Sequence, residues 1–226
     1  MSTKIRVSIL DDHQGIIDGY SYRLNKIPEI EVVATANYGE DIEPLLSNHP
    51  TDVLILDVQV TTSPENFNPY PILHLIPKVL QDYPDLSVLV VSMHNPPTLI
   101  KAVMDAGASG YIFKDDRETI QELGNVIQAV DKGGIHLSQH AYRQLFKMLP
   151  KESTPTRRQL EALSLCASHP DATTAELANR LGIANSTMRN LLSEAYLRLN
   201  VRSKTSAIAK ARQLGLITPE TPAVEF

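Results

Sequence analysis

The chain has 226 residues and a formal net charge of −5, with 42% hydrophobic and 21% charged residues, which is ordinary for a globular protein and long enough for two modest domains. Its one cysteine, Cys166, excludes an intrachain disulfide framework and a cysteine-based metal site, and fits a reducing compartment. No apolar run approaches the roughly 20 residues of a membrane span and there is no signal-peptide layout, so we expect a cytoplasmic protein with no membrane partner.

Charge is distributed unevenly along the chain. Residues 1–150 contain 11 Lys and Arg against 19 Asp and Glu, whereas residues 151–226 contain 10 against 7. An acidic first part and a mildly basic second part predict two domains with different partners. The small positive charge of the second part is weak evidence for a nucleic-acid partner by itself.

Strand-like and helix-like segments alternate over the first 135 residues. Apolar and β-branched runs typical of strands lie at 5–10, 31–36, 52–57, 87–92 and 110–113. Segments of helical length lie at 15–26, 39–48, about 71–82, 97–106 and 117–132. This alternation predicts an α/β doubly wound fold, with a five-stranded parallel sheet covered by helices on both faces, in a domain of residues 1–135.

Polar side chains follow four of the five predicted strands. Asp11 and Asp12 follow the first, Asp57 ends the third, Ser92 ends the fourth and Lys114 follows the fifth. Because ligands of open parallel sheets bind beyond the carboxyl ends of the strands, we expect these side chains to converge. Three carboxylates stay ionised together if a hard cation such as Mg²⁺ lies among them. Ser92 and Lys114 would then contact phosphoryl oxygens, and Asp57 would be the nucleophile that accepts the phosphoryl group.

The motifs DDH, LILD, VVSMH and AGASGYIFK at these strand ends resemble the receiver domain of two-component response regulators, over about residues 4–133. The resemblance implies a flavodoxin-like fold and phosphorylation of Asp57 by a histidine kinase. It also implies a Mg²⁺ ion bound by Asp57, directly by Asp12, mainly through water by Asp11, and by the main-chain carbonyl of Gln59.

The same resemblance assigns a switch. Ser92 would be the switching hydroxyl, Tyr111 the aromatic side chain whose rotamer follows it, and Lys114 the cation that pairs with the phosphoryl group. Gln59 and His94 lie where receiver domains tune dephosphorylation. For His94, an exposed loop position without a role is an equally good interpretation.

The segment after Asp57 departs from that family. Receiver domains usually have Met-Pro and a short glycine turn here, whereas this chain has VQVTTSPENFNPYP over residues 58–71. Its prolines should keep the loop out of a helix until about Pro71, which suits a first helical turn. The longer loop either alters phosphorylation or forms a protein contact.

The remaining residues predict a linker followed by a small helical domain. Residues 136–155 would contain a linker helix, because the pattern there is amphipathic. A hinge would follow this helix, because the segment PKESTPT has a proline near each end. Helix-like segments follow at 156–167, 173–181, 185–199 and 203–214. They predict an all-α domain over 156–218, with a C-terminal tail over 219–226.

The segment ELANRLGIANSTMRNLLSEAYLRLNVRSKT has a short helix, a turn at Gly182 and a longer helix, which is the helix-turn-helix layout. It resembles the LuxR/NarL-type DNA-binding domain, which implies that DNA and a second copy of the chain are partners. The resemblance places Arg189, Asn190 and Ser193 on the exposed face of the recognition helix, where Arg can read guanine and Asn adenine. Residues that would contact phosphates are Ser186, Thr187, Arg202, Ser203 and Lys204.

Three functions fit these observations. The first is a non-enzymatic transcription regulator whose receiver controls DNA binding. The second is an atypical regulator acting through phosphorylation-independent dimerisation or protein contacts, with loop 60–70 as a docking surface and a recognition helix poor in cations. The third is a magnesium phosphatase using Asp57, which the lack of a substrate-pocket segment disfavours.

Overall fold

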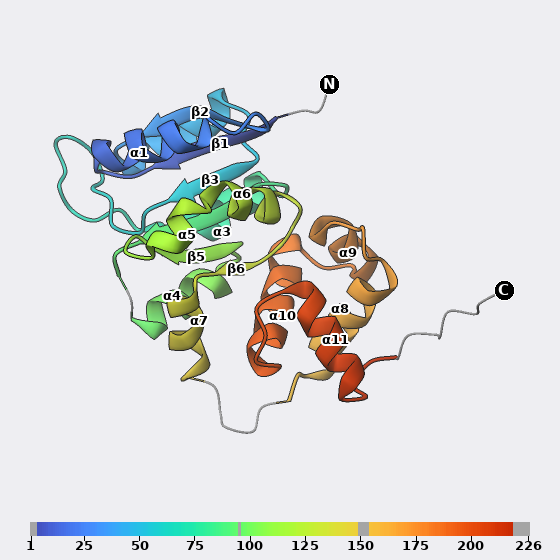
Figure 1. The fold of residues 1–226 in the computed structure, drawn as a ribbon. Helices are drawn as coiled ribbons and strands as arrows, with labels where there is room; N and C mark the ends of the chain where they lie inside the picture. Colours follow the sequence, from blue (N-terminus) through green and yellow to red (C-terminus); the bar gives the residue numbers. More distant parts are fainter. Residues whose placement is uncertain (1–3, 95, 149–153, 219–226) are drawn as a thin grey trace.

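The computed structural model describes residues 4–94, 96–148 and 154–218, and these form an α/β domain and a helical domain that pack against each other (Figure 1). In the described part of the chain, no helix combines the length and the apolar character needed to cross a membrane.

A parallel sheet forms the centre of the α/β domain, with strand order β2-β1-β3-β4-β5-β6. Its first five strands are β1 (Ile5–Leu10), β2 (Ile30–Ala36), β3 (Val53–Leu56), β4 (Ser87–Ser92) and β5 (Gly110–Phe113). Every residue of β3, β4 and β5 is buried, because helices cover both faces. The predicted doubly wound fold is therefore confirmed. A further strand, β6 (His136–Leu137), pairs in parallel with β5 and was not predicted, since two residues carry no periodic pattern.

Helices cover the two faces of this sheet in separate groups. On one face lie α1 (Gln14–Leu24) and α6 (Leu123–Asp131), which pack with inward residues of β1 and β3. The opposite face carries α2 (Ile42–Asn48), α3 (Ile72–Asp82) and α4 (Pro97–Asp105). Two short helices, η1 (Gly39–Asp41) and α5 (Arg117–Gln121), complete the domain. The helix expected over 117–132 is thus two helices that meet at Glu122.

The helical domain contains α8 (Arg157–Ser168), α9 (Thr174–Leu181), α10 (Asn185–Arg198) and α11 (Lys204–Gln213), as expected from the sequence. Reciprocal side-chain and backbone hydrogen bonds cap α8 at Thr156 and α9 at Thr173, which fixes where both helices begin. Gly182, with φ of +64°, ends α9 and turns the chain into α10. The expected C-terminal tail, 219–226, lies outside the described residues.

Helix α7 (Gln139–Phe146) lies between the two domains and packs on α4, β5 and α10. Its residues Ala141, Tyr142 and Leu145 belong to the same buried cluster as the face of the sheet that α3 and α4 cover, and Leu197 of α10 joins that cluster too. The Tyr142 hydroxyl donates a hydrogen bond to Asn200 Oδ1 at 3.0 Å. The expected linker helix is therefore part of the core that joins the two domains.

Candidate functional site

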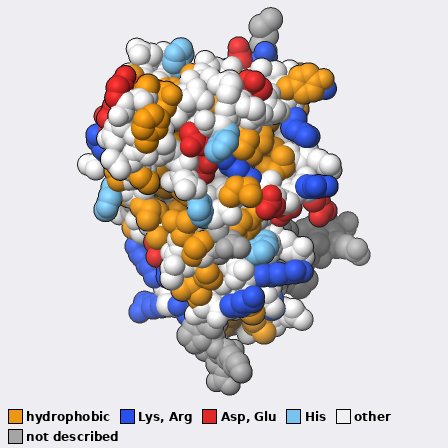
Figure 2. All heavy atoms as spheres, turned by 90° about the vertical axis from the view of Figure 1, so that its left-hand side faces the viewer, with side chains coloured by type: hydrophobic (Ala, Val, Ile, Leu, Met, Phe, Trp, Pro, Cys, Tyr) orange, Lys and Arg blue, Asp and Glu red, His pale blue; other side chains and the backbone are white. Residues whose placement is uncertain are grey.

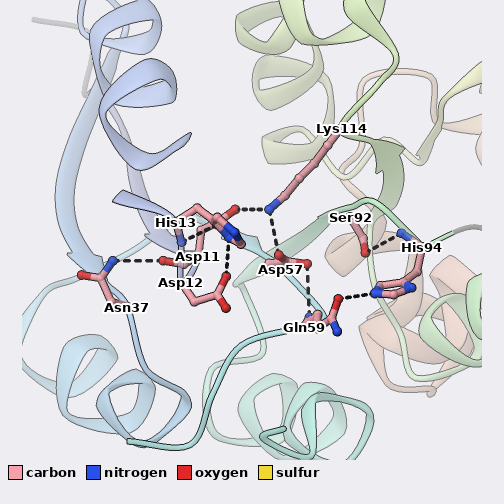
Figure 3. Close-up of polar contacts among 9 residues, drawn as sticks. All are labelled: Asp11, Asp12, His13, Asn37, Asp57, Gln59, Ser92, His94 and Lys114. Atoms are coloured by element: carbon pink, nitrogen blue, oxygen red, sulfur yellow. Dashed lines mark hydrogen bonds and ion pairs between the residues drawn. The ribbon is translucent and has the colours of Figure 1, made fainter. Parts of the chain in front are cut away.

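Three of the predicted side chains meet at the carboxyl ends of the strands (Figure 3). Asp11 follows β1 and is 2% exposed, and Asp57 follows β3 and is 5% exposed. Lys114 follows β5 and reaches between them, with its Nζ 2.6 Å from Asp11 Oδ2 and 2.8 Å from Asp57 Oδ2. One buried ammonium therefore holds two buried carboxylates together, as the order of strands β1, β3, β4 and β5 in the sheet requires.

The charges of this triad do not balance. Burial, the largest influence, raises the pKa of Asp11 above its ordinary value, although Lys114 opposes the shift. Burial also lowers the pKa of Lys114, but hydrogen bonds to Asp11 and Asp57 outweigh it, so that this pKa is raised. Lys114 therefore stays charged, and a further cation beside the carboxylates would favour their ionised forms.

A third carboxylate and a histidine extend the site toward solvent. His13 Nδ1 lies 2.6 Å from Asp12 Oδ1 and 3.5 Å from Asp11 Oδ1. One ligand atom from each of these three residues lies within 4.8 Å of the others. Carboxylate oxygens that converge in this way fit Mg²⁺, a hard cation that prefers oxygen ligands. Sequence reasoning gave no role to His13, although a histidine directly after two aspartates was visible in the motif.

Polar groups at and beyond the ends of β3, β4 and β5 form a connected set of hydrogen bonds. Ser92 is fully buried, and its Oγ accepts a hydrogen bond from the His94 backbone N–H at 3.1 Å. The His94 ring hydrogen-bonds to Gln59 Oε1, and the backbone N–H of Gln59 donates to Asp57 Oδ1 at 3.2 Å. Tyr111 is also fully buried and donates its hydroxyl to the carbonyl oxygen of His94 at 2.7 Å. His94 is thus bonded to three of the predicted residues and is not an isolated loop residue.

A cavity of about 350 Å³ opens above Asp57 and Lys114. Its polar lining includes Asp12, His13, Gln59 and His94 as well. Its apolar lining comprises Ile16, Val60, Phe67, Pro69 and Met93. Figure 2 shows the face of the molecule that bears the carboxyl ends of the strands, where acidic, histidine and hydrophobic side chains lie side by side. The phosphoacceptor candidate therefore lies at the bottom of a pocket with a mixed polar and apolar wall.

Comparison with known proteins agrees with this geometry. Residues 7–125 match the family model described as the response regulator receiver domain. The chain belongs to this family. It is 27% identical to the transcriptional regulatory protein DegU of Brevibacillus brevis over 95% of both chains. It is 26% identical to the transcriptional regulatory protein DesR of Bacillus subtilis, over 93% of this chain and 98% of that protein.

Solved structures with the same fold include the isolated receiver domain of RcsB from Salmonella enterica serovar Typhimurium, in the presence of the phosphomimetic BeF3−. The RcsB receiver domain is 25% identical to this chain, with a TM-score of 0.55. The superposition covers 63% of this chain and 99% of the RcsB chain. A structure of two RcsB dimers bound to two parallel DNAs has a TM-score of 0.57 at 23% identity, over 92% of this chain and 98% of that chain. The second likeness extends the shared fold over both domains.

The predicted base-reading residues are not exposed in this structure. Arg189 is 1% exposed, and its guanidinium donates Nη1 to the carbonyl oxygen of Gly107 at 3.2 Å and Nη2 to that of Leu86 at 3.1 Å. Burial lowers the pKa of Arg189 to about 10. Asn190 Nδ2 donates to the carbonyl oxygen of Asp105 at 2.8 Å, and Ser193 is buried. The expected exposed face is wrong here, because α10 lies against the receiver domain.

The predicted phosphate-contacting residues differ in accessibility. Thr187, Arg202 and Ser203 are exposed, whereas Ser186 and Lys204 are half-buried. The Lys204 ammonium donates to the carbonyl oxygen of Pro170 at 2.9 Å. Only part of the predicted phosphate-contacting set is therefore accessible. These residues do not share one open surface with the predicted base-reading residues in this structure.

Two further hydrogen bonds between the domains were also not predicted from the sequence. Thr174 Oγ1 donates to the carbonyl oxygen of Gly133 at 2.6 Å, and Asn185 Nδ2 donates to that of Pro84 at 3.2 Å. Both pair a polar side chain of the helical domain with a backbone carbonyl of the receiver. No sequence pattern reports such pairs, since the acceptors are backbone atoms distant in the chain.

Proposed function

We propose that this chain is a DNA-binding response regulator, in which phosphorylation of Asp57 by a histidine kinase controls the release of α10, dimerisation and transcription of target genes. One observation carries the proposal. The helix predicted to read DNA is buried against the same domain that carries the phosphoacceptor, through Arg189 and Asn190. The relatives named transcriptional regulatory proteins and the RcsB structure with DNA support this assignment. We place the protein in the cytoplasm and expect no turnover of small phosphate esters.

The pocket has the groups that phosphoryl transfer to Asp57 needs. Asp57 Oδ attacks phosphorus, and Lys114 neutralises charge on the transferred group. Asp11, Asp12, Asp57 and the carbonyl of Gln59 would hold Mg²⁺, which would supply further positive charge to the phosphoryl oxygens. Ser92 is the last residue of β4, and its hydroxyl donates to a phosphoryl oxygen.

A continuous set of contacts joins this pocket to the helical domain. The Tyr111 ring packs edge-on against Phe113 with centroids 5.6 Å apart, and Phe113 lies 4.7 Å from the His140 ring of α7. The Ser138 backbone N–H donates to the Tyr111 carbonyl at 3.0 Å. Movement of Ser92 toward a phosphoryl group would disturb the His94 loop to which Tyr111 is bonded, and hence the seat of α7.

Release of α10 would make the DNA-binding residues available. Arg189 and Asn190 would then reach guanine and adenine edges in the major groove. The residues that complete the proposed interface are Ser186, Thr187, Ser193, Arg202, Ser203 and Lys204. We divide the chain into a receiver over 1–135, a linker over 136–155 and a DNA-binding domain over 156–218, with two copies binding two half-sites.

The test uses the full-length protein with and without phosphoramidate and Mg²⁺. We expect an acid-labile mass increment on Asp57, and tighter binding to a DNA site selected in vitro than to its scrambled version, measured across a salt series. Asp57→Asn should bind DNA with the affinity of the unphosphorylated wild type under both conditions. The proposal is wrong if labelling leaves DNA affinity unchanged, and a labelled protein that dimerises but binds no DNA would favour the protein-contact function.

A further inference from the structure

The segment between β3 and α3 is a folded hairpin. Thr61 and Pro69 form an antiparallel bridge. The backbone N–H and the hydroxyl of Thr62 both donate to the carbonyl oxygen of Asn68, at 3.0 and 2.8 Å. The two arms of residues 61–69, which we call the β3–α3 hairpin, are therefore joined by their own hydrogen bonds.

This hairpin is fixed to the body of the receiver. The backbone N–H groups of Gly39 and Glu40 donate to the carbonyl oxygens of Thr61 and Thr62, at 2.9 and 3.1 Å. Val60, directly before the hairpin, is buried, and its carbonyl accepts from the Tyr70 N–H at 2.9 Å. The hairpin is thus closed at its base by the bond between Tyr70 and Val60, and is held to η1 along its side.

One large apolar side chain on this rigid support is left in solvent. Phe67 is 76% exposed, yet it lines the same cavity as Asp57 and Lys114. Met93, 56% exposed, lines that cavity too. An aromatic ring that adds nothing to the core, but is held beside a reacting group, suits contact with a molecule that enters the cavity.

We propose that Phe67 is a positioning residue that packs against the imidazole ring of phosphohistidine during phosphoryl transfer to Asp57. This inference rests on the proposed role of Asp57 as acceptor. Because Asp57 is 5% exposed and lies in this cavity, the donor has to approach along the cavity wall. Phosphohistidine carries a flat aromatic leaving group next to phosphorus, and a flat ring fits an apolar wall formed by Phe67, Pro69 and Met93.

The transfer itself is balanced without a further reactant. Asp57 Oδ forms a bond to phosphorus while the bond between phosphorus and the imidazole nitrogen breaks. The electron pair stays on that nitrogen, which takes up a proton from solvent. Phe67 forms no bond in this step, so its effect should depend on whether the leaving group has a ring.

Two small donors separate a ring contact from a general effect on the pocket. Phosphoimidazole has the aromatic leaving group of phosphohistidine, whereas phosphoramidate has the same phosphorus–nitrogen bond without a ring. With Mg²⁺ and the full-length protein, Phe67→Ala should lower the phosphorylation rate constant with phosphoimidazole by about 2- to 12-fold, the fold-change that corresponds to one aromatic pair. The rate constant with phosphoramidate should stay unchanged. Phe67→Tyr should retain the wild-type ratio of the two, and so should Tyr22→Ala, which removes an exposed aromatic ring that does not line the cavity.

The outcomes are distinguishable. Equal changes with both donors, or no change with either, overturn the role of Phe67 as a contact for the ring. Faster hydrolysis of phosphorylated Asp57 with an unaltered donor ratio also overturns it, and would make the hairpin a shield against water. If wild type accepts phosphate from neither donor, the proposed function of Asp57 fails instead.

Discussion

Thr174→Val should raise the DNA affinity of the unphosphorylated protein while leaving that of the phosphorylated protein unchanged. Thr174 is the first residue of α9 and is 4% exposed, and its hydroxyl donates to the carbonyl oxygen of Gly133 in the receiver at 2.6 Å. It lies outside both the proposed phosphorylation pocket and the proposed DNA-contacting set. Valine keeps the β-branched shape but removes the donor, so the variant weakens the contact between the domains and little else.

The magnitude follows from the lost hydrogen bond. A buried intramolecular hydrogen bond contributes about 1 kcal/mol net, and a little more when its acceptor is left unpaired. Apparent affinity scales with the fraction of molecules in which α10 is free to bind DNA. Losing about 1 kcal/mol from the contact between the domains should therefore lower the apparent Kd of the unphosphorylated protein for DNA about fivefold. Tyr142→Phe removes the hydrogen bond to Asn200 and should act in the same direction, so the double variant should reach about 30-fold if the two contributions add.

Fluorescence anisotropy with a selected DNA site, in both phosphorylation states, measures these affinities. The control is Thr35→Val, an exposed threonine on β2, which lies at the opposite edge of the sheet from β6. An equal gain in both phosphorylation states would mean that Thr174 affects DNA contact and not the closed state. An unchanged affinity of the unphosphorylated protein would refute the claim that the contact between domains limits DNA binding.

Two further predictions concern cations and protons. Mg²⁺ at about a hundredfold excess over its Kd should stabilise the wild-type fold by about 2.7 kcal/mol, and EDTA or Asp12→Asn should remove this gain in chemical denaturation. Burial lowers the pKa of His136, with Asp116 opposing the shift and Arg202 adding to it. As the pH drops below the ordinary pKa of 6.5, the unfolded state takes up the proton first, so the free energy of unfolding should fall. His136→Gln should remove this dependence of the unfolding free energy on pH. If the dependence is unaltered in the variant, His136 is not its source.

The pocket could be predicted from sequence because the position where each strand ends is encoded locally. Each strand is a run of apolar residues whose polar successor marks its end, and parallel pairing brings those successors to one edge. Asp57 and Lys114, 57 residues apart, are joined by a 2.8 Å contact for this reason. The same reasoning could not detect the β3–α3 hairpin, because its support comes from backbone groups of Gly39 and Glu40.

Burial of α10, the predicted recognition helix, could not be read from the sequence for a different reason. The sequence pattern of α10 predicts a single apolar face. Met188 and Leu192 lie on that face and pack into the core of the helical domain. Leu197, however, lies four residues beyond Ser193, on the face assigned to DNA, and it packs into the buried cluster of the receiver. An apolar residue on a supposed nucleic-acid face was the available signal that this face also packs against protein.

The proposed function requires Arg189 to exchange its contact with the receiver domain for a contact with DNA. Arg189 remains protonated at neutral pH even though burial lowers its pKa to about 10. In the described structure its two terminal nitrogens bond to neutral carbonyl oxygens, and its Nε has no hydrogen-bond partner. Asp85 attracts this buried charge without forming an ion pair with it, and so recovers only part of the free energy lost on leaving water. Guanine N7 and O6 beside a phosphate backbone would satisfy the same guanidinium better. Under the proposed function, Arg189 would therefore exchange its contacts with the receiver for contacts with DNA, and phosphorylation of Asp57 would favour that exchange.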